Sequence, residues 1–598
     1  MQIQQLLQAI KQTPNDPGLY YELGGQYLAH NDTEAALQAY KQALKLAPNH
    51  PQILLQLGNT ETAAQRFTQA ADYFMQCIHI QVDNAAAHYN LGNAYIALGQ
   101  AKNAVKHFRL SLQYQPHDAD AYNNLGNALR DLGQLDEAID CYKQALAIQP
   151  TLHHALTHLI HQKQHTCDWH GLNEEIAQLR NVLKRDPNAQ IAPFALLAMP
   201  DTTAQEQLQC ASQWAQQQFG HLQAVPKSTA SHSGIKPSNT KIKVAYLSAD
   251  FRLHPLAFLI TELLASHDRT QFEIYAYSYG PDDNSAERQQ IAANVDHFVD
   301  IRQWSDPQAA AKIQADGIDI LVDLTGYTKH SRTSIVTLKP APISINWLGY
   351  PGTMGKLKQG SVFDYILVDK TIAPDAGQFA EQCLYLPCYQ PNNAQRPLLD
   401  TPSKAALGLP EDAFVFCSFN QTFKITEAIF ATWMQLLKQV PNSVLWLLEC
   451  NPWAKANLLS YAKQADVSEH RIIFAPRVPI EAHLARHTHA DLFLDTLPYN
   501  AHTTASDALW MDVPVLTCMG ETFPSRVAAS LLNRLELDSL ITHNLDTYVA
   551  RAELLAKDRT LLNNIKTQLQ SRKSQLFNPK GFVQGLETAY IHVYNKIP

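Results

Sequence analysis

Hydrophobic and small residues recur at a fixed spacing over the first 150 positions of the chain. Gly24, Gly58, Gly92 and Gly126 follow one another at intervals of 34 residues. Each Gly follows a Leu, and an aromatic residue comes 16 positions later, at Tyr40, Phe74, Phe108 and Tyr142. Small residues let two helices pack closely, and an aromatic ring fills the gap between them. This pattern predicts paired helices over residues 1–166, with about four full units and a partial fifth, of which the second is degenerate because Val82 stands where proline is expected.

This period resembles that of the tetratricopeptide repeat, a helix–turn–helix of 34 residues. The resemblance implies an α-helical superhelix that binds extended peptides along the first helices of its units. Amides recur on that predicted face, at Asn90 and Asn124 and again three positions later at Asn93 and Asn127. An amide offers a donor and an acceptor together, so Asn90 and Asn124 are candidate acceptor-binding residues. The alternative is that these amides only stabilise the packing of the helices.

Residues 167–240 form a predicted helical transition that ends in a polar linker over residues 225–240. The preceding segment is rich in histidine and cysteine, at His158, His161, His165, Cys167 and His170. Helical spacing spreads these side chains over more than one face, which favours helix packing over a metal site.

From Lys241 onward short apolar runs alternate with amphipathic helices, and the alternation restarts after a polar stretch near residue 391. Such alternation predicts parallel sheets covered by helices on both faces. We therefore expect an α/β region of two lobes, over residues 241–390 and 391–598, that face a cleft. Ligands bind at the carboxyl ends of the strands in sheets of this kind.

Three apolar runs of the second lobe each precede a predicted helix start. The segments between strand and helix are Asn420–Lys424, Pro498–Thr504 and Gly520–Thr522. Helix N-termini present free N–H groups, so three of them at one sheet edge suit a diphosphate, and Lys424 adds a positive charge. Neither a P-loop nor a G-x-G-x-x-G motif is present, which argues against an ATPase or a dinucleotide enzyme.

Composition narrows the classes of function. The net charge of −8 argues against a general nucleic-acid binder. No apolar run is long enough for a membrane span, and the first residues lack the features of a secretory leader, so we expect a cytoplasmic protein without membrane partners. The nine cysteines show no C-x-x-C pair and are expected to be reduced thiols.

Four long motifs resemble those of the protein O-linked N-acetylglucosamine transferase family. They are FNQTFK, HLARHTHADLFLDTLPYNAHTTASDALW, GETFPSRVAASLL and NWLGYPGTMG. The resemblance covers nearly the whole chain apart from the linker, with a bacterial-type layout that lacks the large insertion of the animal enzyme. It implies a GT-B glycosyltransferase, with two Rossmann-like lobes, that transfers N-acetylglucosamine from UDP-GlcNAc to Ser or Thr of proteins, with inversion and without metal or other cofactor.

The resemblance also carries residue roles onto this sequence. It implies that Lys424 contacts the donor phosphate and that His254, in DFRLHP, lies near the reaction centre. Further donor contacts are implied for the nucleotide, the phosphate turn and the sugar loop: Gln421, His483, Arg486, His502, Thr503, Thr504, Asp507, Leu348, Gly349 and Pro351. A metal is not expected, because the single D-x-D, Asp118 and Asp120, lies in a repeat turn and the His483/His487 pair lacks the Glu of a metalloprotease helix.

Several alternatives stay open at this point. Phe423 and Ile480 depart from the family pattern near the nucleotide, so the donor is open between UDP-GlcNAc, GDP-fucose, as in the plant Spindly proteins, and UDP-glucose. An inactive repeat scaffold is the alternative of another class, and the oligomeric state is open. The catalytic base is open among His254, an oxygen of the donor phosphate and, less favoured, Asp323.

Overall fold

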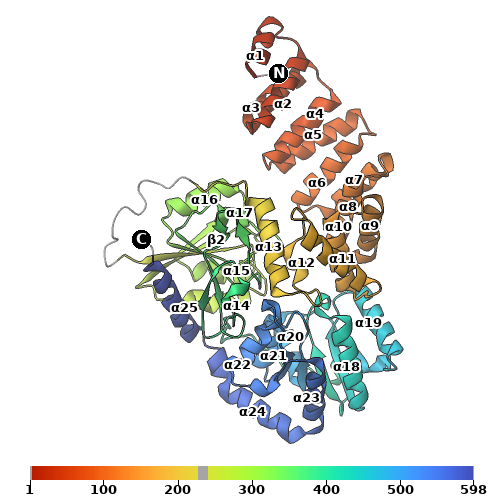
Figure 1. The fold of residues 1–598 in the computed structure, drawn as a ribbon, viewed down its shortest axis with the longest axis vertical. Helices are drawn as coiled ribbons and strands as arrows, with labels where there is room; N and C mark the ends of the chain where they lie inside the picture. The colour runs from red at the N-terminus through yellow and green to blue at the C-terminus, as the bar shows by residue number, and fades with distance from the viewer. Residues whose placement is uncertain (1–2, 226–239, 597–598) are drawn as a thin grey trace. The chain divides into compact units, whose positions relative to one another are not determined.

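The computed structural model describes residues 3–225 and 240–596, so nearly all of the predicted linker lies outside the described residues. The chain divides into two compact units, Met1–Gln162 and Lys163–Pro598. Figure 1 shows only helices in the first unit, whereas the second unit contains two parallel β-sheets with helices packed against them. The division at residue 162 falls within helix α10 (His153–Thr166), four residues before the end of the predicted repeat region.

The first unit is built from antiparallel helix pairs at the predicted period. Its further helices are α1 (Ile3–Gln12), α2 (Pro17–Ala29), α3 (Thr33–Leu46), α4 (Pro51–Ala63), α5 (Phe67–Ile80), α6 (Ala85–Ala97), α7 (Ala101–Tyr114), α8 (Ala119–Asp131) and α9 (Leu135–Ile148). The repeated glycines let the two helices of a pair touch, since a Cβ at Gly58 would lie 2.4 Å from the Phe74 ring. The degenerate second repeat therefore packs like the others, and Val82, in place of the proline, is exposed.

The repeated asparagines bond to one another from repeat to repeat. Asn90 Nδ2 donates to Asn59 Oδ1 at 2.8 Å, and Asn124 Nδ2 donates to Asn93 Oδ1 at 3.0 Å. Asn124 Nδ2 also lies 3.0 Å from the Tyr89 hydroxyl. These half-buried amides thus connect the first helices of successive repeats, and Asn90 and Asn124 as acceptor-binding residues stay a prediction.

The second unit opens with helices α11 (Leu172–Arg185), α12 (Pro193–Leu196) and α13 (Ala204–Phe219). A parallel sheet follows, in the order β3-β2-β1-β4-β5-β8-β9. Its strands are β1 (Ile242–Ser248), β2 (Phe272–Ser278), β3 (His297–Asp300), β4 (Ile320–Asp323), β5 (Ile343–Asn346), β8 (Tyr365–Val368) and β9 (Gln382–Tyr385), joined through helices α14 (Ala257–Ser266), α15 (Ala286–Ala293), α16 (Asp306–Ala315) and α17 (Thr333–Thr337). A short hairpin, β6 (Lys356–Leu357) and β7 (Gly360–Ser361), lies between β5 and β8 in the chain.

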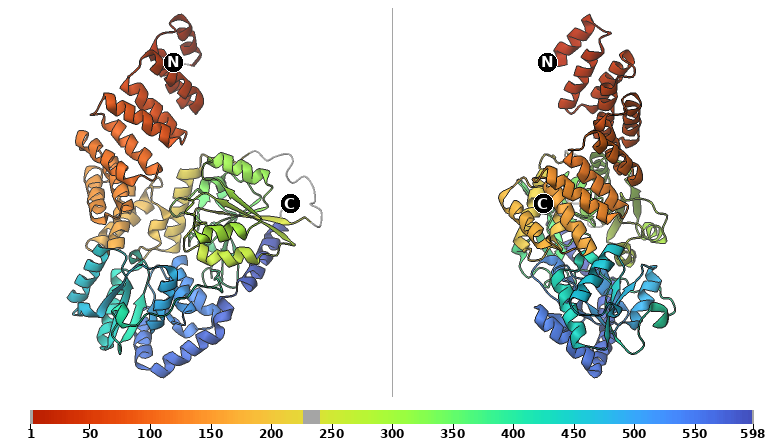
Figure 2. Two further views of the ribbon diagram at one scale, coloured as in Figure 1. Left: turned by 180° about the vertical axis from the view of Figure 1, so that it is seen from behind. Right: turned by 90° about the vertical axis from the view of Figure 1, so that its right-hand side faces the viewer.

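A second parallel sheet has the order β12-β11-β10-β13-β14-β15. Its strands are β10 (Phe414–Ser418), β11 (Ser443–Leu448), β12 (Ile472–Ala475), β13 (Leu492–Leu494), β14 (Val515–Cys518) and β15 (Ile541–Thr542). The helices that follow its strands are α18 (Glu427–Gln439), α19 (Pro452–Gln464), α20 (Ile480–Arg486), α21 (Thr503–Trp510) and α22 (Val527–Arg534). The central strands of both sheets are buried, as their continuous apolar runs predict, whereas the edge strand β3 is partly exposed. Figure 2 shows helices against the sheets.

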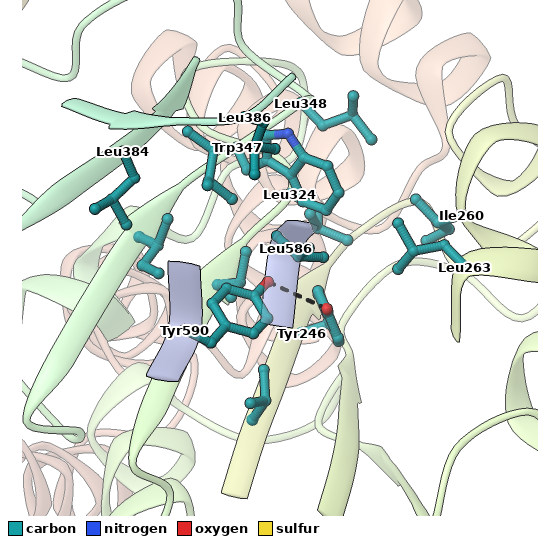
Figure 3. Close-up of a cluster of buried hydrophobic side chains, with 14 of the residues drawn as sticks. Tyr246, Ile260, Leu263, Leu324, Trp347, Leu348, Leu384, Leu386, Leu586 and Tyr590 are labelled. Carbon is teal, nitrogen blue, oxygen red and sulfur yellow. Dashed lines mark hydrogen bonds between the residues drawn. The ribbon is translucent and has the colours of Figure 1, made fainter. Parts of the chain in front are cut away.

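The last helix of the chain returns to the first sheet. After α23 (Leu545–Lys557) and α24 (Arg559–Leu576), helix α25 (Pro579–Tyr594) packs Leu586 and Tyr590 into the core beside Tyr246 of β1 (Figure 3). The Tyr246 and Tyr590 hydroxyls are 3.2 Å apart. Helix α25, the C-terminal helix of the predicted segment 391–598, therefore packs in the core of the first sheet. No helix among the described residues is long and apolar enough to cross a membrane.

Candidate active site

The candidate site lies at the carboxyl ends of β10, β13 and β14, which are neighbours in the second sheet. Helices α18, α21 and α22 begin after these three strands, so their N-termini meet at one edge, as the sequence predicts. Thr426 caps α18 by accepting from the Ile429 N–H, and His502 is the residue before α21. The arrangement places several free N–H groups and a positive helix-dipole end at the same edge.

Lys424 lies within this edge, in a short 3-10 turn, Thr422–Lys424, between β10 and α18. Its Nζ donates to the Asn500 carbonyl at 2.8 Å and lies 4.0 Å from the centre of the Tyr499 ring. Loss of solvent lowers the pKa of Lys424 to about 7, although the nearby Asp495 acts in the opposite direction. Because no carboxylate of the described residues is hydrogen-bonded to Lys424, its charge when protonated is left for an anion, and a bound anion in turn favours the protonated form.

A buried network supports the turn before α21. Asp495 accepts from the N–H groups of Thr496 and Ala501, at 2.8 and 2.6 Å, and from Thr517 Oγ1 at 2.6 Å. Burial raises the pKa of Asp495 to about 6. Asn420, at the end of β10, donates to Thr496 Oγ1 at 2.8 Å. The network therefore joins the ends of β10, β13 and β14.

Three of the predicted phosphate-turn residues lie together at the start of α21. Thr504 Oγ1 donates to Asn420 Oδ1 at 2.5 Å, which ties this turn to the end of β10. The His502 Nε2 is 3.4 Å from the Pro524 carbonyl, and burial together with Lys424 lowers the pKa of His502 well below its usual value. Thr503 is the first residue of the helix. His502 is thus a neutral imidazole near neutral pH.

An aromatic and cationic cluster lies after strands β10 and β12, on the other side of β10 from β13. The Arg486 guanidinium lies 4.6 Å from the centre of the Phe419 ring, donates to the Pro476 carbonyl at 2.7 Å and contacts His483 Nδ1 at 2.5 Å. Burial lowers the pKa of His483 to about 2, so His483 is neutral at neutral pH. Gln421 accepts at 3.1 Å from Arg477. Phe419 and Arg486 are buried within this cluster, so His483 and Gln421, which are half-buried, are the side chains of the cluster left with surface for a nucleobase.

Asp507 has a different environment from the one expected for a free ribose contact. Arg396, from the segment between the two sheets, donates to Asp507 Oδ1 at 2.5 Å and to Ser506 Oγ at 2.8 Å. Burial raises the pKa of Asp507, and Arg396 acts against that shift. A ribose bond to Asp507 therefore has to share the carboxylate with Arg396, and this role stays a prediction.

His254 lies in the loop after β1 of the first sheet. Its Nδ1 accepts from the Leu256 N–H at 3.2 Å, and its Nε2 is 3.8 Å from Asp250 Oδ1. Burial lowers the pKa of His254, whereas Asp250 raises it. Asp323, at the end of β4, is buried and accepts from the N–H groups of Thr325 and Gly326 at 3.1 and 3.0 Å. Burial raises the pKa of Asp323 to about 6.

The predicted sugar loop follows β5. Leu348 has φ +71° and is buried, as is Pro351. Gly349 approaches the end of β4 so closely that an added Cβ would lie 2.0 Å from the Leu324 carbonyl oxygen. Leu348 and Pro351 thus shape the loop from within, whereas Gly349 is half-buried at its surface.

Sequence reasoning missed residues that hold the site together. Tyr499 and Asn500 position Lys424, and Asp495 organises the turn before α21. Their position directly after strand β13 could have indicated them in the sequence, because side chains at the ends of neighbouring parallel strands meet at one edge of the sheet. In the His483/His487 pair, which was considered for metal, His487 Nδ1 is 2.7 Å from the His483 carbonyl.

Helical repeats followed by two parallel α/β sheets, with an anion-receptive edge on the second, define the protein as a tetratricopeptide-repeat protein with a two-lobed glycosyltransferase fold. The chain belongs to Glycosyl transferase family 41, whose model matches residues 166–390 and 392–586. Tetratricopeptide-repeat models match residues 17–60, 92–129 and 119–152.

Curated relatives extend this similarity. The chain is 31% identical over 463 residues to the probable UDP-N-acetylglucosamine–peptide N-acetylglucosaminyltransferase SEC of Arabidopsis thaliana, covering 73% of this chain and 46% of the relative. It is 27% identical over 549 residues to the Caenorhabditis elegans UDP-N-acetylglucosamine–peptide N-acetylglucosaminyltransferase, covering 70% of this chain and 47% of the relative. The chain therefore spans about half the length of the curated relatives it matches.

A solved structure matches the fold. A mutant of the Thermobaculum terrenum O-GlcNAc transferase aligns with a TM-score of 0.68 and 24% identity, over 91% of this chain and 97% of that chain. At this identity the likeness concerns the fold alone.

Proposed function

We propose that this protein transfers N-acetylglucosamine from UDP-GlcNAc to Ser or Thr hydroxyls of proteins, with inversion and without a metal ion. Family membership and the names of the relatives support the reaction class. The observation that carries the proposal is the desolvated Lys424 among three helix N-termini.

In this mechanism the diphosphate lies against Lys424 and the His502–Thr504 turn. The acceptor oxygen forms a bond to the anomeric carbon from the opposite side, and the bond from that carbon to the diphosphate oxygen breaks with its electron pair. Lys424 and the helix N-termini stabilise the negative charge that develops on the leaving UDP. Because these groups are already in place, they stabilise the transition state more than the ground state.

The acceptor proton needs a base, and the geometry of His254 favours the donor phosphate for this role. Since Nδ1 of His254 accepts the Leu256 N–H, the neutral ring carries its own proton on Nε2. That tautomer donates a hydrogen bond and has no free lone pair for the acceptor proton. Asp323 is disfavoured because it is buried, which leaves no surface for an acceptor hydroxyl to approach. His254 then acts as a donor toward an oxygen of the reacting groups.

The repeat unit would recruit the protein acceptor. Support comes from the family models over the repeats and from the amides that line successive first helices. The amides already bond to one another, so an acceptor backbone has to use their remaining donors and acceptors.

The identity of the donor has specific alternatives, which are GDP-fucose and UDP-glucose. The relatives include SPINDLY of Arabidopsis thaliana, 30% identical over 382 residues, which is likewise named a probable UDP-N-acetylglucosamine–peptide N-acetylglucosaminyltransferase. A direct test incubates the protein with a Ser-rich acceptor peptide and labelled UDP-GlcNAc, UDP-glucose or GDP-fucose, with and without EDTA. Label transfer from UDP-GlcNAc that survives EDTA supports the proposal. Transfer from GDP-fucose alone, or loss of transfer in EDTA, contradicts it.

A further inference from the structure

The last turn of helix α10 belongs to the second compact unit. The last carbonyl groups of any α-helix lack partners within the helix and must find them elsewhere. Here the His165 carbonyl accepts from Thr422 Oγ1 at 2.6 Å and from Asn451 Nδ2 at 2.9 Å. The Thr166 carbonyl accepts from Asn457 Nδ2 at 2.9 Å. Side chains of the second lobe therefore cap this helix.

Thr422 is two residues before Lys424 and belongs to the same 3-10 turn. Its side chain is buried, and its own carbonyl lies 3.8 Å from the Cys167 thiol. The turn is thus bonded to the segment His165–Trp169 through both its side chain and its backbone. Trp169 extends this attachment, since its N–H donates to the Tyr461 hydroxyl of α19 at 3.3 Å and its ring is 4.5 Å from that of Tyr461.

Aromatic rings connect the same segment to the lysine. The His165 ring is 5.1 Å from the Phe423 ring, and the Phe423 ring is 5.8 Å from the Tyr499 ring. Tyr499 is the ring over which Lys424 Nζ lies. Lys424 therefore contacts Asn500 and Tyr499, and the Tyr499 ring belongs to a row of tilted and edge-to-face rings that begins on helix α10.

We propose that Thr422 is a positioning residue, which fixes the Lys424 turn by capping helix α10, so that the segment directly after the repeats forms a structural part of the donor-phosphate site. This inference rests on the proposed function for its kinetic consequence alone. Loss of the cap leaves the His165 carbonyl with one partner fewer and frees the turn to move. A displacement of about 1 Å at a reacting group is enough to lower a rate by roughly a hundredfold.

The test compares Thr422→Val, which keeps the shape and removes the donor, with Thr422→Ser, which restores it. The matched control is Thr432→Val on α18, which also removes a buried hydroxyl from the second lobe; Thr432 Oγ1 donates within its own helix, to the Ala428 carbonyl at 2.8 Å. We expect Thr422→Val to lower kcat with UDP-GlcNAc at least about tenfold while KM for a short peptide stays within about twofold. Thr422→Ser and Thr432→Val should retain kcat.

A second readout needs no ligand. Labelling of Lys424 by an amine-reactive ester, followed by mass spectrometry, gives its pKa from the dependence on pH. The titratable groups that act on Lys424 are Asp495 and His502, and neither is changed in these variants. A looser turn admits water, so the labelling midpoint of Lys424 should rise by about one unit or more in Thr422→Val and stay unchanged in Thr432→Val.

The outcomes separate the two proposals. A wild-type protein that transfers no sugar from UDP-GlcNAc refutes the proposed function, while the labelling midpoint still decides the role of Thr422. Equal kcat and equal midpoints in Thr422→Val and wild type would overturn the positioning role. So would equal losses in Thr422→Val and Thr432→Val, because these would indicate a general loss of packing.

Discussion

Binding of the nucleotide sugar should be coupled to the uptake of one proton by Lys424. In the free protein, desolvation lowers the pKa of Lys424 to about 7. A bound diphosphate favours the charged ammonium and returns that pKa toward the ordinary lysine value of about 10.4. Between these two pKa values the bound protein holds a proton that the free protein lacks. The affinity for the nucleotide sugar should therefore fall as pH rises through this window.

The size of the effect can be worked out. At pH 8 about nine-tenths of the free lysine is neutral, so each binding event should take up about 0.9 proton. Between pH 7 and pH 9 the dissociation constant should increase about fiftyfold, because the protonated fraction of Lys424 in the free protein falls from about one half to about one hundredth. UDP-GlcNAc is a suitable ligand for the measurement at pH 8, because neither its diphosphate nor its uracil titrates appreciably near that pH.

Calorimetric titration at pH 8 in two buffers of different ionisation enthalpy measures the proton uptake. The matched variant is Lys424→Arg, which keeps the charge and cannot lose its proton. It should bind with little dependence on pH and with proton uptake near zero. Because the variant leaves His502 unchanged, equal uptake in Lys424→Arg and wild type would assign the proton to another group and refute the argument. No uptake in wild type would also refute it.

Three further results are expected. UDP at 100 times its dissociation constant should stabilise the protein by about 2.7 kcal/mol in a thermal-shift assay, with or without EDTA, and GDP should not; a larger shift with GDP would favour the fucosyl donor. Gly349→Ala should lower transfer at least about tenfold, since its Cβ would meet the Leu324 carbonyl at 2.0 Å, and unchanged kcat would show that the sugar loop tolerates displacement. Replacing Asn90 and Asn124 together by Ala should lower the free energy of unfolding of the repeats by roughly 1–3 kcal/mol, because each loses an inter-repeat bond, and should raise KM for a long unfolded acceptor more than for a short peptide. Equal KM changes for the two acceptors would contradict a role of these amides in acceptor binding.

The repeats and the two α/β lobes could be predicted from the sequence because their signals are local and periodic. Small residues every 34 positions specify helix pairs, and apolar runs followed by helix starts specify parallel strands. The position of the candidate site could also be predicted, because the segments that follow neighbouring parallel strands meet at the carboxyl edge of the sheet. Strands β10, β13 and β14 are such neighbours. Lys424 could therefore be placed among helix N-termini before the fold was known.

Tertiary structure alone decided how those residues are held. The partners of Lys424 are Tyr499 and Asn500, more than 70 positions away, and the cap of helix α10 joins Thr422 to a carbonyl 257 positions earlier. Asn90 and Asn124 bond to asparagines of the preceding repeats, although their spacing fits a free binding face equally well. Periodicity determines which face a side chain occupies, whereas its partner depends on the register between distant segments and on how much water their packing excludes. The pKa of Lys424 and the attachment of α25 to the first sheet depend on that packing and could not be derived from the order of residues.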